Sequence, residues 1–306
     1  MARTRFPADR GLASRMVLTM FLLGLLYVVF IGVLTALGTS FLVVLLIAGG
    51  LLFAQYAFSD RIALFSMNAH EVSAAQAPVL HGTIDRLCAL ADMAKPRVAI
   101  ADTDLPNAFA TGRDADHAVV AVTTGLLRRL DGPELEAVLA HELSHVAHRD
   151  VMVMTIASFL GIAAGLLTRF AFYSGMFGGF GGRHGDDDDR GTPAVLVVLL
   201  VSVVVYAVSF LLTRALSRYR ELSADRAAAV LTGRPSTLAA ALVKISGEMS
   251  RIPTRDLRSA EPLNAFFFAP ALAPGFSISS LFSTHPSLER RLEQLTRIEA
   301  DLGRPR

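Results

Sequence analysis

The sequence predicts a mainly α-helical membrane protein with four transmembrane helices and a cytoplasmic α+β domain that contains a small sheet. Composition is the first indication: 53% of the 306 residues are hydrophobic and 18% are charged, whereas a soluble domain is about one quarter charged. Apolar segments long enough to cross a bilayer are the second indication. The third is a strand-like run of residues directly before a helix that carries two histidines.

The first two helices, predicted at 16–36 and 40–58, come from one apolar stretch. Residues Val17 to Phe58 contain no charged side chain, and this run is about twice the ~20 residues that one transmembrane helix requires. The stretch must fold back on itself, and Gly38-Thr39-Ser40 is its best turn. A cleaved signal peptide is the competing interpretation, but its apolar region would be only ~7–15 residues. Residues 1–60 are therefore expected to form a transmembrane hairpin.

Residues 61–150 are expected to form the first part of the α+β domain. The segment His117 to Thr123 is rich in β-branched residues, which predicts a strand. Two placements of this strand are open. It can be an edge strand that pairs with the backbone of a bound peptide, or an internal strand beside Arg97 to Ala101.

The helix that follows is predicted from its beginning and its apolar spacing. Asp131-Gly132-Pro133 gives a turn, with Pro133 suited to the first helical position. Glu134 and Glu136 lie in the first turn, where the helix dipole favours negative charge. Apolar residues then recur at helical spacing, so one side should be buried. They are Leu135, Val138, Leu139 and Val146.

This helix carries the sequence His141-Glu142-Leu143-Ser144-His145. Residues four apart share one face of an α-helix, so His141 and His145 can reach the same metal ion. Glu142 is one step round the helix, where it can act on a water molecule. This H-E-x-x-H spacing is the signature of zinc peptidases, in which the glutamate is the general base. The alternative is a surface helix with two chance histidines.

A second transmembrane hairpin is expected at residues 151–213. Its helices are predicted from the apolar segments Val151 to Thr168 and Ala194 to Leu212. Between them, a glycine-rich run at 175–182 and the aspartates at 186–189 indicate a loop. The aspartates lack the spaced oxygen ligands and the turn glycine of a calcium site, so solvation is the better explanation.

The arginines that flank the apolar segments predict the orientation. By the positive-inside rule, both termini and the histidine helix lie in the cytoplasm of a multi-pass plasma (inner) membrane protein. Two further arginines, Arg183 and Arg190, fall on the other side, but four aspartates lie between them. The residues on the cytoplasmic side are Arg3, Arg5, Arg10, Arg15, Arg61, Arg149, Arg214, Arg218 and Arg220.

Residues 214–306 are expected to form the second part of the α+β domain and to supply a third metal ligand. Glu221 and Asp225 are four apart on one predicted helical face, so one can bind metal while the other orients an imidazole. The residues alone leave an ordinary charged helix with an Arg218–Glu221 pair equally open. With Cys88 as the only cysteine, a zinc site must use histidine and carboxylate ligands. Two more helices are predicted at Thr237 to Met249 and Leu288 to Leu302.

Four motifs in this order resemble those of the HtpX-type membrane zinc metallopeptidases, which are related to the CAAX prenyl endopeptidases. The motifs are Pro106 to Gly112, Glu134 to Asp150, Glu221-x-x-x-Asp225 and Thr284-His285-Pro286. Four apolar segments lie in the family's positions, so the resemblance covers nearly the whole chain. Leu222 stands where an aromatic residue is more usual and the acidic loop is unlike the family, which bears on substrate preference and local packing.

The resemblance implies a zincin-like metalloprotease fold with one Zn²⁺ per chain. It also implies a role for each motif residue. His285 is a candidate donor to the oxyanion of the reaction, or simply a histidine that flanks a helix. The implied residues are the zinc ligands His141, His145 and Glu221, the general base Glu142, the supporting carboxylate Asp225, and the active-site residues Asn107 and His285.

The resulting interpretation is a zinc endopeptidase that cleaves polypeptides at the cytoplasmic membrane face. The resemblance implies that misfolded membrane proteins are its substrates, in membrane quality control and stress response. A net charge of +2 gives no indication of a nucleic-acid partner. The sequence leaves the oligomeric state open.

Three other classes of protein are alternatives. An intramembrane (site-2-like) protease would bury its motif in lipid, but Glu134, Glu136, Arg149 and Asp150 flank this one, and buried charges are costly. A zinc-stabilised scaffold without activity would have a closed fourth coordination position. A transporter should carry charges inside its helices, and Arg169, at a helix end, is the only candidate.

Overall fold

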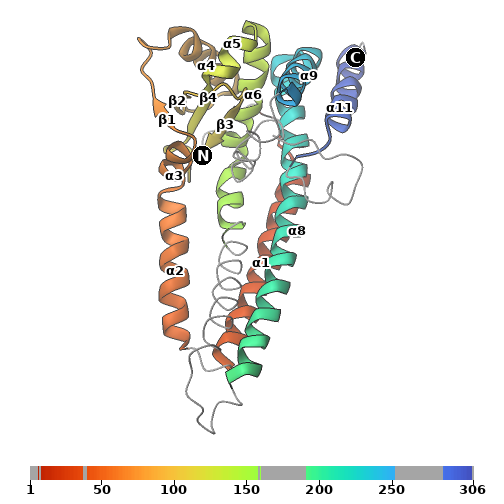
Figure 1. Ribbon diagram of the computed structural model, residues 1–306. Helices are drawn as coiled ribbons and strands as arrows, with labels where there is room; N and C mark the ends of the chain where they lie inside the picture. Colours follow the sequence, from red (N-terminus) through yellow and green to blue (C-terminus); the bar gives the residue numbers. More distant parts are fainter. Residues whose placement is uncertain are drawn as a thin grey trace. The chain divides into compact units, whose positions relative to one another are not determined.

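The computed structural model describes residues 6, 8–36, 40–157, 159, 191–251 and 285–304 (Figure 1). The chain divides into two compact units. The sheet unit consists of Met1–Ala13, Phe58–Met152 and Arg214–Arg306, and the apolar unit consists of Ser14–Ala57 and Val153–Thr213. The predicted turn at Gly38-Thr39, most of the third apolar segment, the 175–182 and 186–189 loop, Arg169 and Thr284 lie outside the described residues.

The apolar unit is built from α1 (Arg10–Ala36) from Ser14 onward, α2 (Phe41–Ala57), the helical residues 153–157 and the first part of α8 (Gly191–Thr232). The predictions of helical structure at 16–36 and 40–58 are confirmed, although α1 begins earlier. Among the described residues, Arg10–Ala36 and Leu196–Thr232 are long and apolar enough to cross a membrane, while α2 is shorter. Their shared core is small: Leu23, Phe30, Leu34, Ala157 and Val205.

Helix α8 is longer than the sequence predicted. The apolar segment Ala194 to Leu212 and the charged segment around Glu221 form one continuous helix of 42 residues. No proline or glycine separates the two segments, so nothing in the sequence ends the helix between them. The first part of α8 belongs to the apolar unit, and the part from Arg214 onward belongs to the sheet unit.

The sheet has four strands in the order β1-β2-β4-β3. Strand β2 (Arg97–Ala101) pairs in parallel with β4 (Val119–Thr123), and β1 (Ala69–Glu71) and β3 (Ala108–Thr111) pair antiparallel at the two edges. The edge placement of the 117–123 strand is therefore wrong, and the internal placement beside Arg97–Ala101 is confirmed. Every residue of β4 is buried, which suits a strand with neighbours on both sides and both faces covered.

Helix α6 (Gly132–His148) carries the two histidines and begins and ends at defined residues. The Asp131 side chain accepts from the Glu134 N–H, and the Glu134 side chain accepts from the Asp131 N–H, which together form a capping box. At the other end, Arg149 has a φ of 55°, a left-handed conformation that stops the helix. The predicted helix is thus confirmed with its start at the predicted turn.

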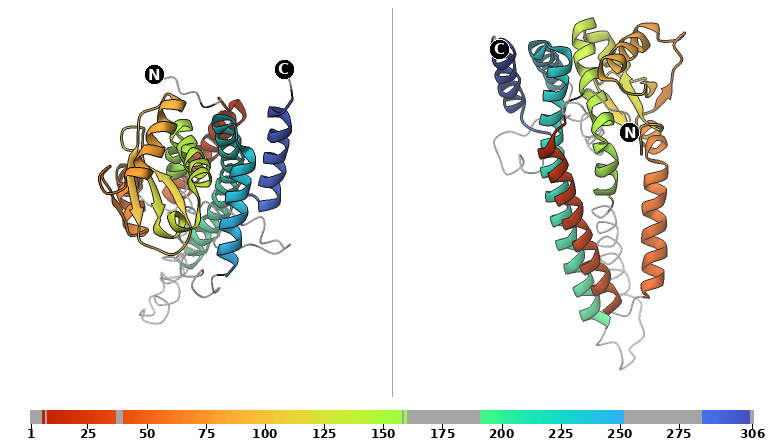
Figure 2. Two further views of the ribbon diagram at one scale, coloured as in Figure 1. Left: turned by 90° about the horizontal axis from the view of Figure 1, so that it is seen from above. Right: turned by 180° about the vertical axis from the view of Figure 1, so that it is seen from behind.

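Helices α4 (Pro78–Ala91), α5 (Thr124–Arg129), α9 (Pro235–Arg251) and α11 (Leu288–Leu302) complete the core of the sheet unit. Helix α6 contacts β3, α4 and α9, and α11 packs on α9. The view from behind shows α11, in dark blue, beside α9 (Figure 2). The predicted helix at 288–302 matches α11, and the one at 237–249 lies within α9. This packing brings α6, α8 and α11 together although they are far apart in the sequence.

Candidate metal centre

Helices α6 and α8 bring His141, His145 and Glu221 together. One possible ligand atom from each residue lies within 4.8 Å of the other two. The Nε2 atoms of His141 and His145 are each 3.6 Å from a different oxygen of the Glu221 carboxylate. The two imidazole rings are 4.9 Å apart at an angle of 86°. The sequence left the third ligand open between a metal-binding and an ordinary charged helix, and the geometry favours the metal-binding alternative.

These three residues fit a divalent cation. All are buried, with exposed fractions of 1%, 5% and 5%. Within the described part of the chain, Glu221 Oε2 makes no hydrogen bond of good geometry, although His285 Nδ1 lies 3.2 Å away, and this is costly for a buried carboxylate oxygen. Two ligand atoms on a tetrahedral zinc, each ~2.0–2.1 Å from it, would be ~3.3 Å apart, so the 3.6 Å separations need only a small contraction. Two histidines and one glutamate are also a known catalytic zinc ligand set.

Two aspartates fix the orientation of the imidazoles. Asp225 Oδ1 is 2.9 Å from His141 Nδ1, and Asp150 Oδ2 is 2.9 Å from His145 Nδ1. A carboxylate at Nδ1 keeps the proton there and leaves Nε2 free to bind a metal, directed at Glu221. Asp225 was expected beside the site, whereas the sequence analysis used Asp150 only as a flanking charge.

Each of these aspartates is held by an arginine that the sequence analysis missed. Arg291, from α11, donates two hydrogen bonds to Asp225 at 2.7 and 2.6 Å, and it is only 2% exposed. Arg220 donates to Asp150 Oδ1 at 3.0 Å. Burial alone would raise the pKa of Asp150, but the charges of Arg220 and His145 outweigh it and lower the pKa to about 2. The Asp150 carboxylate is therefore charged at neutral pH.

Glu142 lies beside the metal ligands in a buried position. Its side chain is 4% exposed, and burial raises its pKa to about 8, assisted by Glu221 and opposed by His141. The main-chain N–H of Ala110, in edge strand β3, donates to the Glu142 carboxylate. The carboxylate is thus tied to β3, an edge strand of the sheet among the described residues.

The structure also places the two residues that were assigned from the resemblance alone. His285 Nδ1 is 3.2 Å from Glu221 Oε2, and its side chain is 4% exposed, so it belongs to the same buried cluster. Asn107 is fully buried directly before β3. Its main chain exchanges hydrogen bonds with Thr123, the last residue of β4, which fixes the start of the edge strand.

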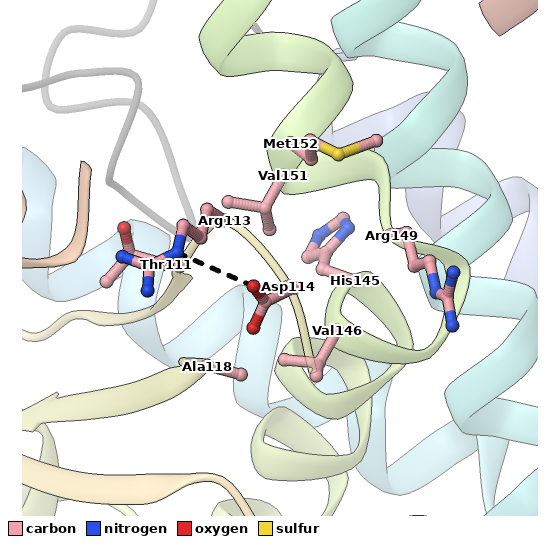
Figure 3. A pocket seen from close by; sticks show the side chains of 10 residues that line it. Thr111, Arg113, Asp114, Ala118, His145, Val146, Arg149, Val151 and Met152 are labelled. Atoms are coloured by element: carbon pink, nitrogen blue, oxygen red, sulfur yellow. Dashed lines mark ion pairs between the residues drawn. The ribbon is translucent and has the colours of Figure 1, made fainter. Parts of the chain in front are cut away.

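A pocket opens between the end of β3 and the end of α6, next to His145 (Figure 3). On one side, Arg113 and Asp114 form an ion pair at 3.5 Å. Gly112, at the turn, has a φ of +128°, and an added Cβ would lie 2.5 Å from the His117 carbonyl oxygen, so this turn requires glycine. The pocket is lined by Thr111, Gly112, Arg113, Asp114, Ala118, His145, Val146, Arg149, Val151 and Met152.

Comparison with known proteins gives a consistent result. The model of peptidase family M48 matches residues 74–299. "Protease HtpX homolog 1" of Streptomyces coelicolor is 60% identical over 302 residues, 98% of this chain and 97% of that protein. "Protease HtpX homolog" of Moorella thermoacetica is 56% identical over 300 residues, 98% of each chain. The crystal structure of S. mikatae Ste24p superposes with a TM-score of 0.53 at 17% identity, covering 94% of this chain and 67% of that one, which shows a shared fold.

Proposed function

Because the chain belongs to peptidase family M48 and is a membrane metalloprotease, we propose that it is a zinc endopeptidase whose metal is held by His141, His145 and Glu221. The observation that carries this assignment is the buried convergence of one ligand atom from each residue within 4.8 Å. One zinc ion per chain satisfies the set. The histidine and carboxylate donors are those that zinc prefers in catalytic sites.

Bound zinc supplies a Lewis acid that polarises the peptide carbonyl and lowers the pKa of water. Glu142 takes the proton of the attacking water and returns it to the leaving amine. The Ala110 N–H orients the Glu142 carboxylate for this transfer. His285, within the same buried cluster, donates to the oxygen on which negative charge develops, and Asn107 lines the substrate side of the site.

The substrate backbone is proposed to pair with β3 rather than with β4. Strand β3 lies at the edge of the sheet, and it carries the N–H that bonds Glu142. An extended peptide added to this edge is recognised through its main chain, which suits a protease with varied substrates. The pocket beside His145 is small, so only a small side chain of the peptide would enter it. The preference for that side chain would then depend on Val146, Val151 and Met152.

The membrane arrangement is proposed from the arginine distribution and the apolar segments. The proposed membrane segments are α1, α2, the apolar part of α8 and the apolar run at 151–168, most of which is assigned from the sequence alone. The positive-inside rule places both termini and the sheet unit in the cytoplasm at the plasma membrane. Polypeptides are the proposed substrates, in agreement with the similarity to proteins named as proteases. Misfolded membrane proteins are proposed among them from the resemblance of the motifs alone.

The test is Glu142→Gln in the full-length, detergent-purified protein. We expect the variant to retain one zinc per chain by metal analysis, because the ligands are unchanged, and to lose casein cleavage. His148→Gln is the matched control, because His148 lies on the same helix but contacts the Phe6 ring rather than the cluster. Turnover by Glu142→Gln close to that of the unaltered protein would refute the mechanism. An unaltered protein that binds zinc without cleaving any polypeptide would instead indicate a scaffold.

A further inference from the structure

Helix α3 (Ser59–Ser66) exposes an apolar face that the proposed chemistry does not use. Phe58, Ile62 and Phe65 are 46%, 49% and 89% exposed. With Arg61, they follow the spacing i, i+3, i+4 and i+7, which places all four on one side of the helix. The Arg61 guanidinium lies 5.7 Å from the centre of the Phe58 ring. Single exposed apolar residues are ordinary, but a contiguous face of this kind marks an interaction surface.

The position of this face in the chain indicates its partner. Phe58 directly follows α2, whose 17 residues span ~25 Å, whereas the hydrocarbon core of a bilayer is ~30 Å thick. A helix of this length falls short of the full thickness of the core, so the residues that follow it complete the crossing and belong at the level of the boundary with the headgroups. Phenylalanine and isoleucine suit the acyl side of that boundary, and an arginine can extend to the phosphates.

We propose that the α3 face, defined by Phe58, Arg61, Ile62 and Phe65, lies in the interfacial layer of the lipid bilayer. The proposal rests on α2 crossing the membrane and does not depend on catalysis. A second copy of the chain is a poorer occupant. A fully buried aromatic side chain contributes about 150–250 Å², so three partly exposed side chains do not approach the ~800 Å² that each partner buries in a stable dimer.

The opposite face of α3 packs against the sheet, so contact of α3 with lipid would also affect the position of the sheet. Ala63 and Met67 pack with Phe109 of edge strand β3. Asp60, which is 6% exposed, forms an ion pair with Arg97 at the start of β2. Helix α3 is thus attached to the sheet through both a core contact and a buried carboxylate. Lipid contact at its other face would fix the height of the substrate-binding edge relative to the membrane surface.

The experiment uses the absence of tryptophan from the sequence. Phe65→Trp, in the full-length protein reconstituted into liposomes, places a single fluorophore on the α3 face. We expect emission at short wavelength and several-fold stronger quenching by lipids brominated near the headgroup than for Val79→Trp. Val79, at the start of α4, is the matched control, because it is 76% exposed and lies on another helix.

Two results would overturn the proposal. One is Phe65→Trp emission as red and as weakly quenched as that of Val79→Trp. The other is blue-shifted emission that brominated lipid does not quench and that reddens as the protein is diluted with lipid, which would indicate a second copy of the chain. Phe58→Trp provides the same measurement if Phe65→Trp fails to fold. Casein cleavage is measured separately on the unaltered protein, so an absence of cleavage there, with quenching of Phe65→Trp intact, would count against the proposed function alone.

Discussion

Replacing Asp225 with asparagine tests the proposed organisation of the metal centre most directly. Asp225 is fully buried between His141 Nδ1, at 2.9 Å, and the two hydrogen bonds from Arg291. Asp225→Asn keeps the size of the side chain but removes its charge. His141 loses the carboxylate that orients it, and the Arg291 guanidinium, 3.9 Å from Glu221 Oε2, loses its main partner and competes with the metal for Glu221.

The expected effects follow from these contacts. Loss of a carboxylate behind a ligand histidine typically lowers metal affinity 10–100-fold, or about 1.4–2.7 kcal/mol. Removing one partner of a buried ion pair costs about 3–5 kcal/mol of stability, because the other charge stays buried. Zinc affinity is measured by competition with a chromophoric chelator, and stability by thermal unfolding of the metal-free protein. Asp301→Asn, on the exposed side of α11, is the control and should change neither quantity.

The double variant Asp225→Asn/Arg291→Met separates orientation from folding. It removes both buried charges, so we expect much of the lost stability to return. Zinc affinity should stay low, because His141 still lacks its carboxylate. Unchanged zinc affinity in Asp225→Asn would refute the reasoning. Recovery of affinity together with stability in the double variant would show that the effect came from folding alone.

Three further predictions concern the base, the edge strand and the pocket. In the metal-free protein, burial raises the Glu142 pKa from 4.5 to about 8. Between these pH values the folded state retains a proton that the unfolded chain has lost. The contribution of this group to the free energy of unfolding is therefore present below pH 4.5 and is lost as the pH rises to 8. The thermal midpoint should therefore fall more steeply between pH 5 and 8 than in Glu142→Gln, and equal slopes would contradict the assignment. Peptides with one N-methylated amide should lose about two- to tenfold in kcat/KM at the positions that pair with β3, since each hydrogen bond contributes ~0.5–1.5 kcal/mol. Uniform cleavage across the series would exclude main-chain pairing. Met152→Ala enlarges the pocket and should shift the kcat/KM preference about tenfold toward peptides with a larger side chain at one position. The reason is that one added or missing methylene group in an apolar pocket changes transition-state binding by ~1–3 kcal/mol. An unchanged preference would show that the pocket binds no substrate side chain.

Local patterns in the sequence predicted the elements that carry the chemistry. Asp131, Pro133 and Glu134 set the start of α6 through capping and helix-dipole effects that act within one turn. The four-residue spacing of His141 and His145 needs only helix geometry to place both rings on one face. Helix α11 was likewise predicted from its local sequence, and its observed boundaries, Leu288–Leu302, are the predicted ones.

Features that depend on distant residues were not predictable. Asp225 and Arg291 are separated by 66 positions, and nothing in the local pattern pairs them. Strand β3 has only four residues, too few for an alternating pattern, so the sequence could not show that it covers one side of β4. Asp150 reaches His145 because Arg149 adopts a left-handed turn, which an arginine does not signal.

The late position of Arg291 and His285 has a consequence for biosynthesis. Both residues are synthesised after the two histidines of α6 and after Glu221. Until they are added, the nascent chain lacks the guanidinium that neutralises Asp225 and the imidazole beside Glu221. Under the proposed mechanism, a partly synthesised chain that stops before His285 would therefore have an incomplete active site and would not cleave neighbouring proteins.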